Sequence, residues 1–441
     1  CFFSFRIDCN DHVLIIHGFR IIEKKNENCY DGIMNNPERT KLLLSSIGSP
    51  QQDLHFIHVC GSNGKGSVCA LLDSVLRAAG YRVGLFTSPH LQDERERIKV
   101  NGKMISREAH DILSALLEPE AEKMTDKPGY FCFLTALGIG YFAQQHCDFV
   151  ILETGIGGTY DSTNAIDSPE LTVVTNIGLE HTELLGSTVT QIARDKAGII
   201  KPGTICAAYD QDPEVMDVIR EACKKSHVPL RVADFSSVTK VSDKPDADSL
   251  DGQFIKRNGI LYKLALLGSF QINNAALALT AIDALRERGW LIPAEAVHTG
   301  FQTVSWPARF EVLSRNPLLI LDGGHNPQCA RALVQTLDDY FPNQKAVFLT
   351  GFMKDKNYQE VISILMPKAD RFYCVAPPDT RGLPAEDLAA CLRQAGADAQ
   401  AFSTTAEGLH RAQEEAASLP VIVFGSLYLA GEIRDLIGLA P

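Results

Sequence analysis

The segment that most constrains the fold is residues 54–79, in which an apolar run, a glycine-rich loop and a helical pattern follow one another. Residues 54–59 have the composition of a buried strand, and residues 68–79 have the apolar spacing of a helix. Between a strand and a helix, backbone N–H groups and the helix N-terminus can bind phosphate, and Lys65 adds a positive charge. The segment therefore predicts a nucleotide-binding loop made of Gly61, Ser62, Asn63, Gly64, Lys65, Gly66 and Ser67.

The rest of the chain alternates short strand patterns with helical ones, which predicts an α/β protein with parallel sheets and crossover helices. The apolar positions of the expected strands are contiguous, as in strands that are covered on both faces. A polar stretch at 240–252 predicts an exposed loop or a hairpin connection, and the alternation restarts beyond residue 303. We therefore expect an N-terminal extension over 1–29, a nucleotide-binding domain over 30–302, for which the resemblance described below implies ATP, and a smaller α/β domain over 303–441.

Composition excludes several classes of protein. Lys and Arg number 42 against 54 for Asp and Glu, so the net charge is −12, and the chain has no basic block of the kind that coats nucleic acid. The 12 cysteines include no C-x-x-C pair, and no apolar run approaches the roughly 18 residues of a membrane helix. The beginning of the chain also lacks the pattern of a secretory signal. These features predict a cytoplasmic protein with reduced thiols that binds neither nucleic acid nor membrane.

The phosphate loop departs from the common G-x-x-x-x-G-K-[ST] pattern, because only two residues separate its first two glycines and Gly66 separates the lysine from Ser67. This shortened loop resembles the G-T-x-G-K-G-S loop of the folylpolyglutamate synthase and dihydrofolate synthase family, within the wider Mur ligase group. The resemblance extends from about residue 30 to the C-terminus. It rests on ordered matches at residues 87–91, 96–98 with Gly102, 153–158, 161–164, 195–199, 271–275, 306–309 with Glu311, 322–327, 351–356 and 425–428.

The resemblance implies a Mur-ligase-like fold: a P-loop ATPase-type domain with a parallel sheet, followed by a smaller Rossmann-like C-terminal domain that acts in glutamate ligation. It implies an ATP-dependent ligase that adds L-glutamate to the γ-carboxyl group of reduced folate through an acyl phosphate. Whether dihydropteroate is a second acceptor is left open. The resemblance also implies a monomer with its active site in the cleft between the domains.

The same resemblance assigns roles to residues outside the phosphate loop. Ser88, Glu153 and His181 match a first magnesium site, and Lys196 matches a carbamylated lysine that would support a second Mg²⁺. Lys65, Lys196 and His325 are the expected catalytic residues. The positions that match nucleotide-binding residues are Asn274, Arg309 and Asp322, and those expected to face substrate are Phe131, Asp161 and Ser426.

Spacing alone would favour plainer roles for several of these residues. Glu153 would be a carboxylate at a strand end, His181 a loop histidine, and His325 a turn histidine that bonds the backbone. Lys196 would be a helix lysine that is paired with Asp195 or solvated.

The chain departs from the family pattern T-x-F-E, which reads Gly129-Tyr-Phe-Cys132 here, and Glu180 replaces an aspartate before His181. The missing threonine and carboxylate lie where the resemblance places the folate pocket, so use of dihydropteroate in particular is questioned.

Three other functions fit the sequence less well. A muramoyl-peptide ligase with a UDP-linked substrate predicts an added N-terminal domain, for which the roughly 50 residues before the phosphate loop are too few. A P-loop switch or motor protein requires Ser or Thr directly after Lys65, and an inactive folate-binding module would not need Lys65, Glu153 and His181.

Overall fold

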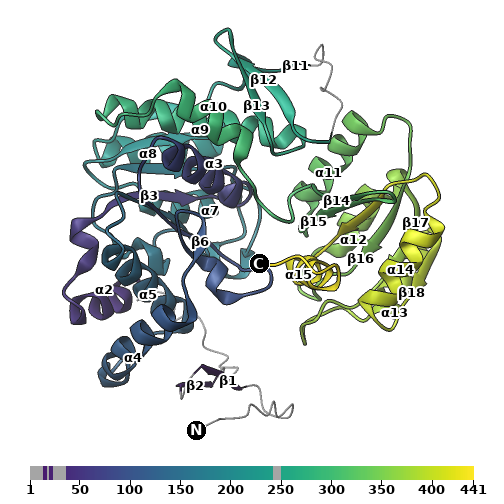
Figure 1. Ribbon diagram of the computed structural model, residues 1–441, viewed down its shortest axis with the longest axis horizontal. Coiled ribbons are helices and arrows are strands. Elements are labelled where there is room, and N and C mark those ends of the chain that lie inside the picture. The colour runs from purple at the N-terminus through teal and green to yellow at the C-terminus, as the bar shows by residue number, and fades with distance from the viewer. Residues whose placement is uncertain (1–12, 17–18, 23–35, 242–249) are drawn as a thin grey trace.

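A computed structural model describes residues 13–16, 19–22, 36–241 and 250–441 (Figure 1). Most of the predicted extension 1–29 and the centre of the polar stretch 240–252 lie outside the described residues. Within the extension, strands β1 (Val13–Ile16) and β2 (Phe19–Ile22) pair in antiparallel fashion.

The first large sheet has eight strands in the order β10-β9-β8-β3-β7-β4-β5-β6. Its strands are β3 (His55–Cys60), β4 (Val83–Phe86), β5 (Ile98–Val100), β6 (Lys103–Met104), β7 (Phe149–Glu153), β8 (Leu171–Val174), β9 (Ile205–Ala208) and β10 (Leu230–Val232). The central strands β7 and β8 are buried along their whole length, which confirms the prediction of strands covered on both faces.

The sheet is parallel from β10 to β4, as predicted, and the edge formed by β5 and β6 is an antiparallel addition. Only Asn101 and Gly102 connect these two strands, and both have positive φ (48° and 77°). A two-residue turn of this kind closes an antiparallel hairpin, whereas a parallel pair needs a long crossover. The Asn-Gly pair was the sequence signal for this hairpin.

Helices cover both faces of this sheet. One face packs on α3 (Lys65–Ala78), α9 (Ser269–Glu287) and α10 (Ala294–Thr303). The opposite face packs on α2 (Asn36–Ser46), α4 (Arg107–Lys123), α5 (Tyr130–Gln144), α7 (Val189–Lys196) and α8 (Pro213–Lys225). A small antiparallel sheet of β11 (Val238–Val241), β12 (Gln253–Arg257) and β13 (Ile260–Leu264) follows, and the polar stretch at 240–252 lies between its first two paired strands.

The second large sheet has six strands in the order β14-β15-β19-β16-β17-β18. All its pairs are parallel except that of β14 with β15. Its strands are β14 (Glu311–Arg315), β15 (Leu318–Asp322), β16 (Ala346–Thr350), β17 (Ala369–Cys374), β18 (Ala399–Ala401) and β19 (Val421–Phe424). Strands β15, β16, β17 and β19 confirm the alternation that the sequence predicts beyond residue 303, and β14 is an antiparallel addition at the edge.

The helices of the second sheet also lie on both faces. One face packs on α11 (Pro327–Tyr340), α12 (Tyr358–Leu365) and α13 (Ala385–Gln394), and the other on α14 (Thr405–Glu415) and α15 (Leu427–Leu436). Residues 304–310 connect α10 to β14. The domain boundary near residue 303 stays a prediction.

No helix in the described ranges is both long and apolar enough to cross a membrane, and the nine cysteines within those ranges are all free thiols. The cytoplasmic location stays a prediction.

His58, at the centre of β3, gives the fold a defined sensitivity to acid. Its side chain is fully buried, Nε2 lies 2.8 Å from Oγ1 of Thr163, and burial, reinforced by the charge of Lys201, lowers the pKa of His58 to about 3. An unfolded histidine binds a proton below pH about 6.5, whereas the buried one stays neutral. His58 should therefore stabilise the folded state above pH 6.5 and lose that contribution as the pH falls towards 3.

We expect wild type to lose about 2 kcal/mol more unfolding free energy than His58→Gln between pH 6.5 and pH 5. Chemical denaturation at both pH values measures the difference. The control is His410→Gln, since the side chain of His410 is 75% exposed. An equal loss in wild type and His58→Gln would contradict the prediction.

Candidate active site

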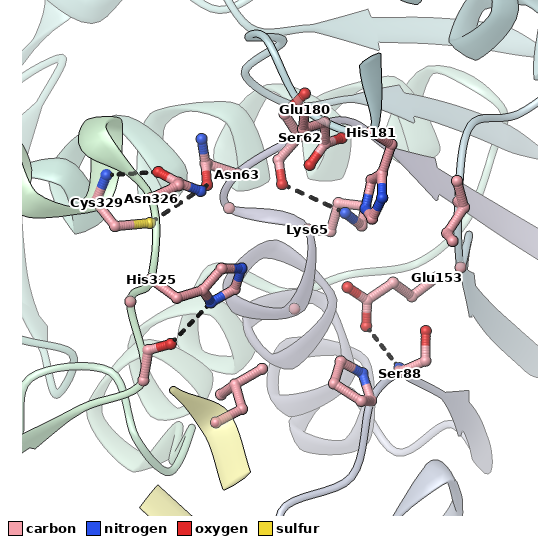
Figure 2. A pocket seen from close by; sticks show the side chains of 18 of the residues that line it. Ser62, Asn63, Lys65, Ser88, Glu153, Glu180, His181, His325, Asn326 and Cys329 are labelled. Atoms are coloured by element: carbon pink, nitrogen blue, oxygen red, sulfur yellow. Dashed lines mark hydrogen bonds between the residues drawn. The ribbon is translucent and has the colours of Figure 1, made fainter. Parts of the chain in front are cut away.

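A cavity of about 860 Å³ opens where the carboxyl ends of the strands of both large sheets face each other. Its walls include the phosphate loop and the end of β7 from the first domain, and the turn after β15 from the second. Figure 2 shows the two sets of side chains facing each other across this cavity. Ligands of open α/β sheets bind at such strand ends, so this cavity is the candidate active site.

The phosphate loop turns sharply because two of its glycines have positive φ, 144° at Gly61 and 88° at Gly64. A Cβ atom on Gly61 would lie 1.9 Å from Oγ1 of Thr175, so no other residue fits there. Helix α3 begins at Lys65, three residues earlier than the sequence predicts. The ammonium group of Lys65 folds back onto the loop and donates to the carbonyl oxygen of Gly61 at 2.9 Å.

Helix α9 supports the loop from behind. Gln271 donates to Oγ of Ser67 at 3.1 Å and accepts from the amide of Asn274 at 2.9 Å. A Cβ on Gly64 would lie 2.6 Å from Oδ1 of Asn274, so this side chain lies against the loop backbone. Asn274 lines the cavity, and its role in nucleotide binding stays a prediction.

Ser88 and Glu153 lie together at the cavity wall. Oε2 of Glu153 accepts a hydrogen bond from the backbone N–H of Ser88 at 3.1 Å (Figure 2). Burial raises the pKa of Glu153, although the charge of Lys65 and the Ser88 N–H oppose the rise. Within the described ranges no basic side chain forms an ion pair with Glu153, so a bound cation would stabilise its ionised form.

His181 lies in the loop after β8 and also lines the cavity, but its side chain is exposed. In the described part of the chain, no group of three or more His, Cys, Asp or Glu side chains is placed to hold a metal ion. A cation at Glu153 would therefore take most of its ligands from hydroxyl groups, water or phosphate oxygens. Mg²⁺ has this preference, so the donors present fit it.

Lys196 is a buried cation with one acidic partner. Its side chain is 1% exposed, and Nζ lies 2.7 Å from Oε1 of Glu180 and donates to the carbonyl of Gly61 at 3.0 Å. Spacing alone favoured a lysine that is either paired with Asp195 or solvated, and both expectations are wrong. Lys196 is buried, and the carboxylate of Asp195 instead accepts from the Gly158 N–H at 2.8 Å. Burial would raise the pKa of Glu180, but the charges of Lys65 and Lys196 outweigh it and lower that pKa to about 2.

Arg309 and Asp322 place opposite charges on the second-domain wall. Asp322 is buried and accepts from the backbone N–H groups of Phe310 (3.0 Å) and Gly324 (2.8 Å). Burial raises its pKa, and the charge of Arg309 opposes this rise. Arg309 donates to its neighbour, the carbonyl of Ala308, at 2.8 Å. Asp322 therefore orders its own turn, and Arg309 places a guanidinium at the cavity opposite Glu153.

His325 and Ser426 lie on the same wall. Nδ1 of His325 is 3.1 Å from the carbonyl of Gly323, as the turn-histidine alternative expects, and the residue also lines the cavity. Burial, together with the nearby charge of Lys356, lowers the pKa of His325 to about 4, so its imidazole is neutral at pH 7. Ser426 caps α15, since its Oγ accepts from the N–H of Tyr428 at 3.1 Å.

The predicted substrate residues of the first domain differ in what they can contact. Phe131 lines the cavity beside Tyr130 and Tyr160. Asp161 also lines the cavity, but it is buried, and its carboxylate accepts from the backbone N–H groups of Gly155 (2.9 Å) and Ile156 (3.0 Å), so it shapes the loop after β7.

Cys132 takes the position of the absent carboxylate and does not line the cavity. Its thiol is buried, 3.2 Å from Oδ1 of Asn36 and 3.2 Å from Oγ of Ser162, and burial raises its pKa. Asn36 and Ser162 both line the cavity, so the thiol of Cys132 lies directly behind these two lining residues.

The structure adds residues that the sequence did not single out. Lys356 and Arg97 line the cavity, and each lies within a segment that matches the family pattern, 351–356 and 96–98. Asn63, predicted as a nucleotide contact, directs its side chain at the second domain, where the amide of Asn326 donates to its Oδ1 at 3.2 Å (Figure 2). Its own amide donates to Gln328.

Two family models match the chain. The Mur ligase middle domain matches residues 133–282, and the Mur ligase glutamate ligase domain matches residues 308–427. Each match falls within one of the two α/β units described above.

Two relatives show how far the similarity extends. The dihydrofolate synthase/folylpolyglutamate synthase of Bacillus subtilis is 35% identical over 364 residues, and the match covers 81% of this chain and 84% of that protein. A probable bifunctional folylpolyglutamate synthase/dihydropteroate synthase of Haloferax volcanii is 35% identical over 420 residues, 90% of this chain and 48% of that protein. The chain thus spans most of the Bacillus protein and about half of the Haloferax one.

Two solved structures share the fold. Mycobacterium tuberculosis folylpolyglutamate synthase, complexed with ADP and AMPPCP, superposes with a TM-score of 0.83 at 29% identity and covers 92% of this chain and 96% of that one. The bifunctional folylpolyglutamate synthase/dihydrofolate synthase of Yersinia pestis, complexed with AMPPNP and a Mn ion, has a TM-score of 0.78 at 29% identity, with coverage of 91% and 93%. Nucleotide and a divalent metal thus bind in structures similar to this one.

Proposed function

Because the chain belongs to the folylpolyglutamate synthase and dihydrofolate synthase family of Mur ligases, we propose that it is an ATP-dependent ligase that adds L-glutamate to the γ-carboxylate of tetrahydrofolate. The observation that supports the proposal is that the phosphate loop and Glu153 face Arg309 and His325 of the second domain across one shared cavity.

The reaction needs activation of a carboxylate, because an amine cannot displace oxide. A carboxylate oxygen attacks the γ-phosphorus of ATP, the bond between that phosphorus and the β,γ-bridging oxygen breaks, and ADP leaves. The amino nitrogen of glutamate then attacks the acyl carbon, the C–O bond to phosphate breaks, and the amine loses a proton. The products are an amide, ADP and phosphate, so the protein needs anion binding and positioning rather than a covalent nucleophile.

The residues of the cavity suit these steps. The backbone N–H groups of the phosphate loop and the ammonium of Lys65 would bind the β- and γ-phosphates. Arg309 would neutralise charge on the transferred phosphoryl group from the opposite wall. His325, neutral at pH 7, could accept or donate a hydrogen bond there without adding charge. Phe131 offers an aromatic face for the pterin ring.

Metal ions belong to the same proposal. Ser88 and Glu153, with His181, would hold a Mg²⁺ that supplies charge neutralisation at the nucleotide phosphates. For carbamylation, the ammonium of Lys196 first loses a proton, and the neutral amine then adds CO₂ and releases a second proton, so that a cation becomes an anion. Two negative charges would then lie where the structure has the Lys196–Glu180 ion pair, an arrangement that a second Mg²⁺ would stabilise.

The proposal also covers a second acceptor, dihydropteroate, and the oligomeric state. We propose that dihydropteroate is also a substrate, because the cavity keeps Phe131, the aromatic residue expected beside the pterin ring, and Cys132 does not line it. We also propose that the protein is a monomer, as the family resemblance implies.

The test is incorporation of labelled L-glutamate by the purified protein with Mg-ATP, with tetrahydrofolate and dihydropteroate compared as acceptors and ADP measured in parallel. We expect amide formation with both acceptors and one ADP for each amide bond. Incorporation with tetrahydrofolate alone would contradict the second activity. ADP release without incorporation from either acceptor would contradict the folate assignment.

A further inference from the structure

A contact between the two domains lies beside the cavity and involves residues that the proposed reaction does not use. On the first domain, residues 88–93 form a turn that begins at the proposed metal ligand Ser88. The carboxylate of Glu96 fixes the shape of this turn, because it accepts from the backbone N–H groups of Leu91 (3.0 Å), Gln92 (2.7 Å) and Asp93 (2.7 Å). The turn therefore presents Gln92 at a defined place.

Gln92 reaches helix α15 of the second domain with both ends of its amide. Its Oε1 accepts from Nε of Arg434 at 2.9 Å, and its Nε2 donates to Oδ1 of Asp435 at 2.8 Å and to the carbonyl of Leu439 at 2.8 Å. The backbones are also in close contact, since a Cβ on Gly431 would lie 2.1 Å from the carbonyl oxygen of Leu91.

Arg434 continues the contact into the second domain. It is 7% exposed, its Nη1 donates to Oε1 of Glu311, and its Nη2 donates to the carbonyl of Ala440 at 3.2 Å. Oε2 of Glu311 accepts from the backbone N–H of Ala308 at 2.8 Å, and Ala308 directly precedes Arg309. One buried guanidinium thus links the turn that carries Ser88 to the segment that carries Arg309.

We propose that Arg434 is a positioning residue that holds the two halves of the active site in register through Gln92 and Glu311. The contact itself does not depend on the proposed function; only the expected loss of amide formation rests on it. Each of these hydrogen bonds is directional, and the planar guanidinium donates to three acceptors at once: the side chains of Gln92 and Glu311 and the carbonyl of Ala440. If the contact opens, Ser88 and Arg309 lose their relative position and water reaches the activated carboxylate, so ATP is consumed without amide formation.

The first variant is Gln92→Ala, which removes the hydrogen bonds from Gln92 to Arg434, Asp435 and Leu439 and leaves the buried Arg434–Glu311 pair intact. We expect kcat for amide formation to fall about 10- to 100-fold, KM for Mg-ATP to change less than about twofold, and ADP formed per amide to rise above one. Arg434→Gln should have the larger effect of the two. Arg434→Lys should recover only part of it, because an ammonium cannot reproduce the planar fork.

Hydrogen–deuterium exchange gives a readout that does not depend on catalysis. We expect Arg434→Gln to accelerate exchange in both segments, 88–93 in the first domain and 306–311 in the second. Gln92→Ala should accelerate exchange in 88–93. The matched control is Arg220→Ala on α8, which removes an exposed ion pair with Asp217 far from the cavity and should change neither segment.

The outcomes separate this inference from the proposed function. Unchanged exchange in 88–93 for both variants would overturn the inference, whether or not the wild type is a ligase. In an active wild type, variants that lose thermal stability but keep one ADP per amide would also overturn it, because they would show a role in folding alone. If wild type makes no amide but the variants exchange faster than wild type in 88–93, the result would support the contact and count against the ligase.

Discussion

Replacing Lys65 with alanine is expected to lower kcat about 10³-fold or more and to leave the protein folded. In the structure the ammonium of Lys65 is held by the carbonyl of Gly61, at the first residue of α3, where it faces the cavity. A cation in this position stabilises charge on the phosphoryl group as it is transferred, and removal of one such group typically costs at least two to three orders of magnitude. Single-turnover measurement of ADP formation with saturating ATP tests this.

The fold should survive because Lys65 has no acidic partner within ion-pair distance among the described residues, so alanine leaves no unpaired buried carboxylate. The control variant is Lys225→Ala, an exposed lysine at the end of α8, which should retain wild-type kcat. A Lys65→Ala variant with kcat within tenfold of wild type would show that the phosphate loop is not the catalytic nucleotide site.

Replacing Lys196 with arginine is expected to abolish most of the activity, with a loss of about 10²-fold or more in kcat. Arginine keeps the positive charge and can still pair with Glu180, but its guanidinium stays protonated and cannot form a carbamate. If the proposed carbamate is required, arginine fails although it preserves the ion pair. Steady-state amide formation in the presence of bicarbonate measures the loss.

Two further measurements make the Lys196 prediction specific. Wild type in ¹³C-labelled bicarbonate should show a carbamate carbon signal by NMR that is absent in Lys196→Arg. The control is Lys201→Arg, since Lys201 is a nearby lysine whose Nζ donates to the backbone carbonyl of Asn164 at 2.9 Å. Near wild-type activity in Lys196→Arg, with no carbamate signal in wild type, would show that the ammonium form is the working one.

The parts of the site that follow from neighbouring residues could be predicted from the sequence. The phosphate loop is one example, because glycine at Gly61 and Gly64 permits positive φ whatever the rest of the chain does. The buried strands are another, since contiguous apolar residues such as those of β7 and β8 must be covered on both faces. Resemblance to a family added the expected roles of Glu153, His181 and Lys196, which spacing alone would have left as a strand-end carboxylate, a loop histidine and a helix lysine paired with Asp195 or solvated.

Other features escaped sequence reasoning although the signal was present. The hairpin of β5 and β6 was marked by Asn101-Gly102, a pair that favours a two-residue antiparallel turn. Helix α3 starts at Lys65 because the left-handed Gly64 ends the loop there, whereas apolar periodicity becomes visible only from Val68.

The sequence by itself determined the α/β class, the phosphate loop and the order of the motifs, since these depend on local conformational preference and on hydrophobic period. Only the tertiary structure decided which partner each buried cation has. Lys196 pairs with Glu180 rather than with Asp195. Arg434 contacts Gln92 and Glu311, which lie 342 and 123 positions away in the sequence. A buried charge takes the partner that the packed sheets and helices place within reach, and no local pattern specifies that distance.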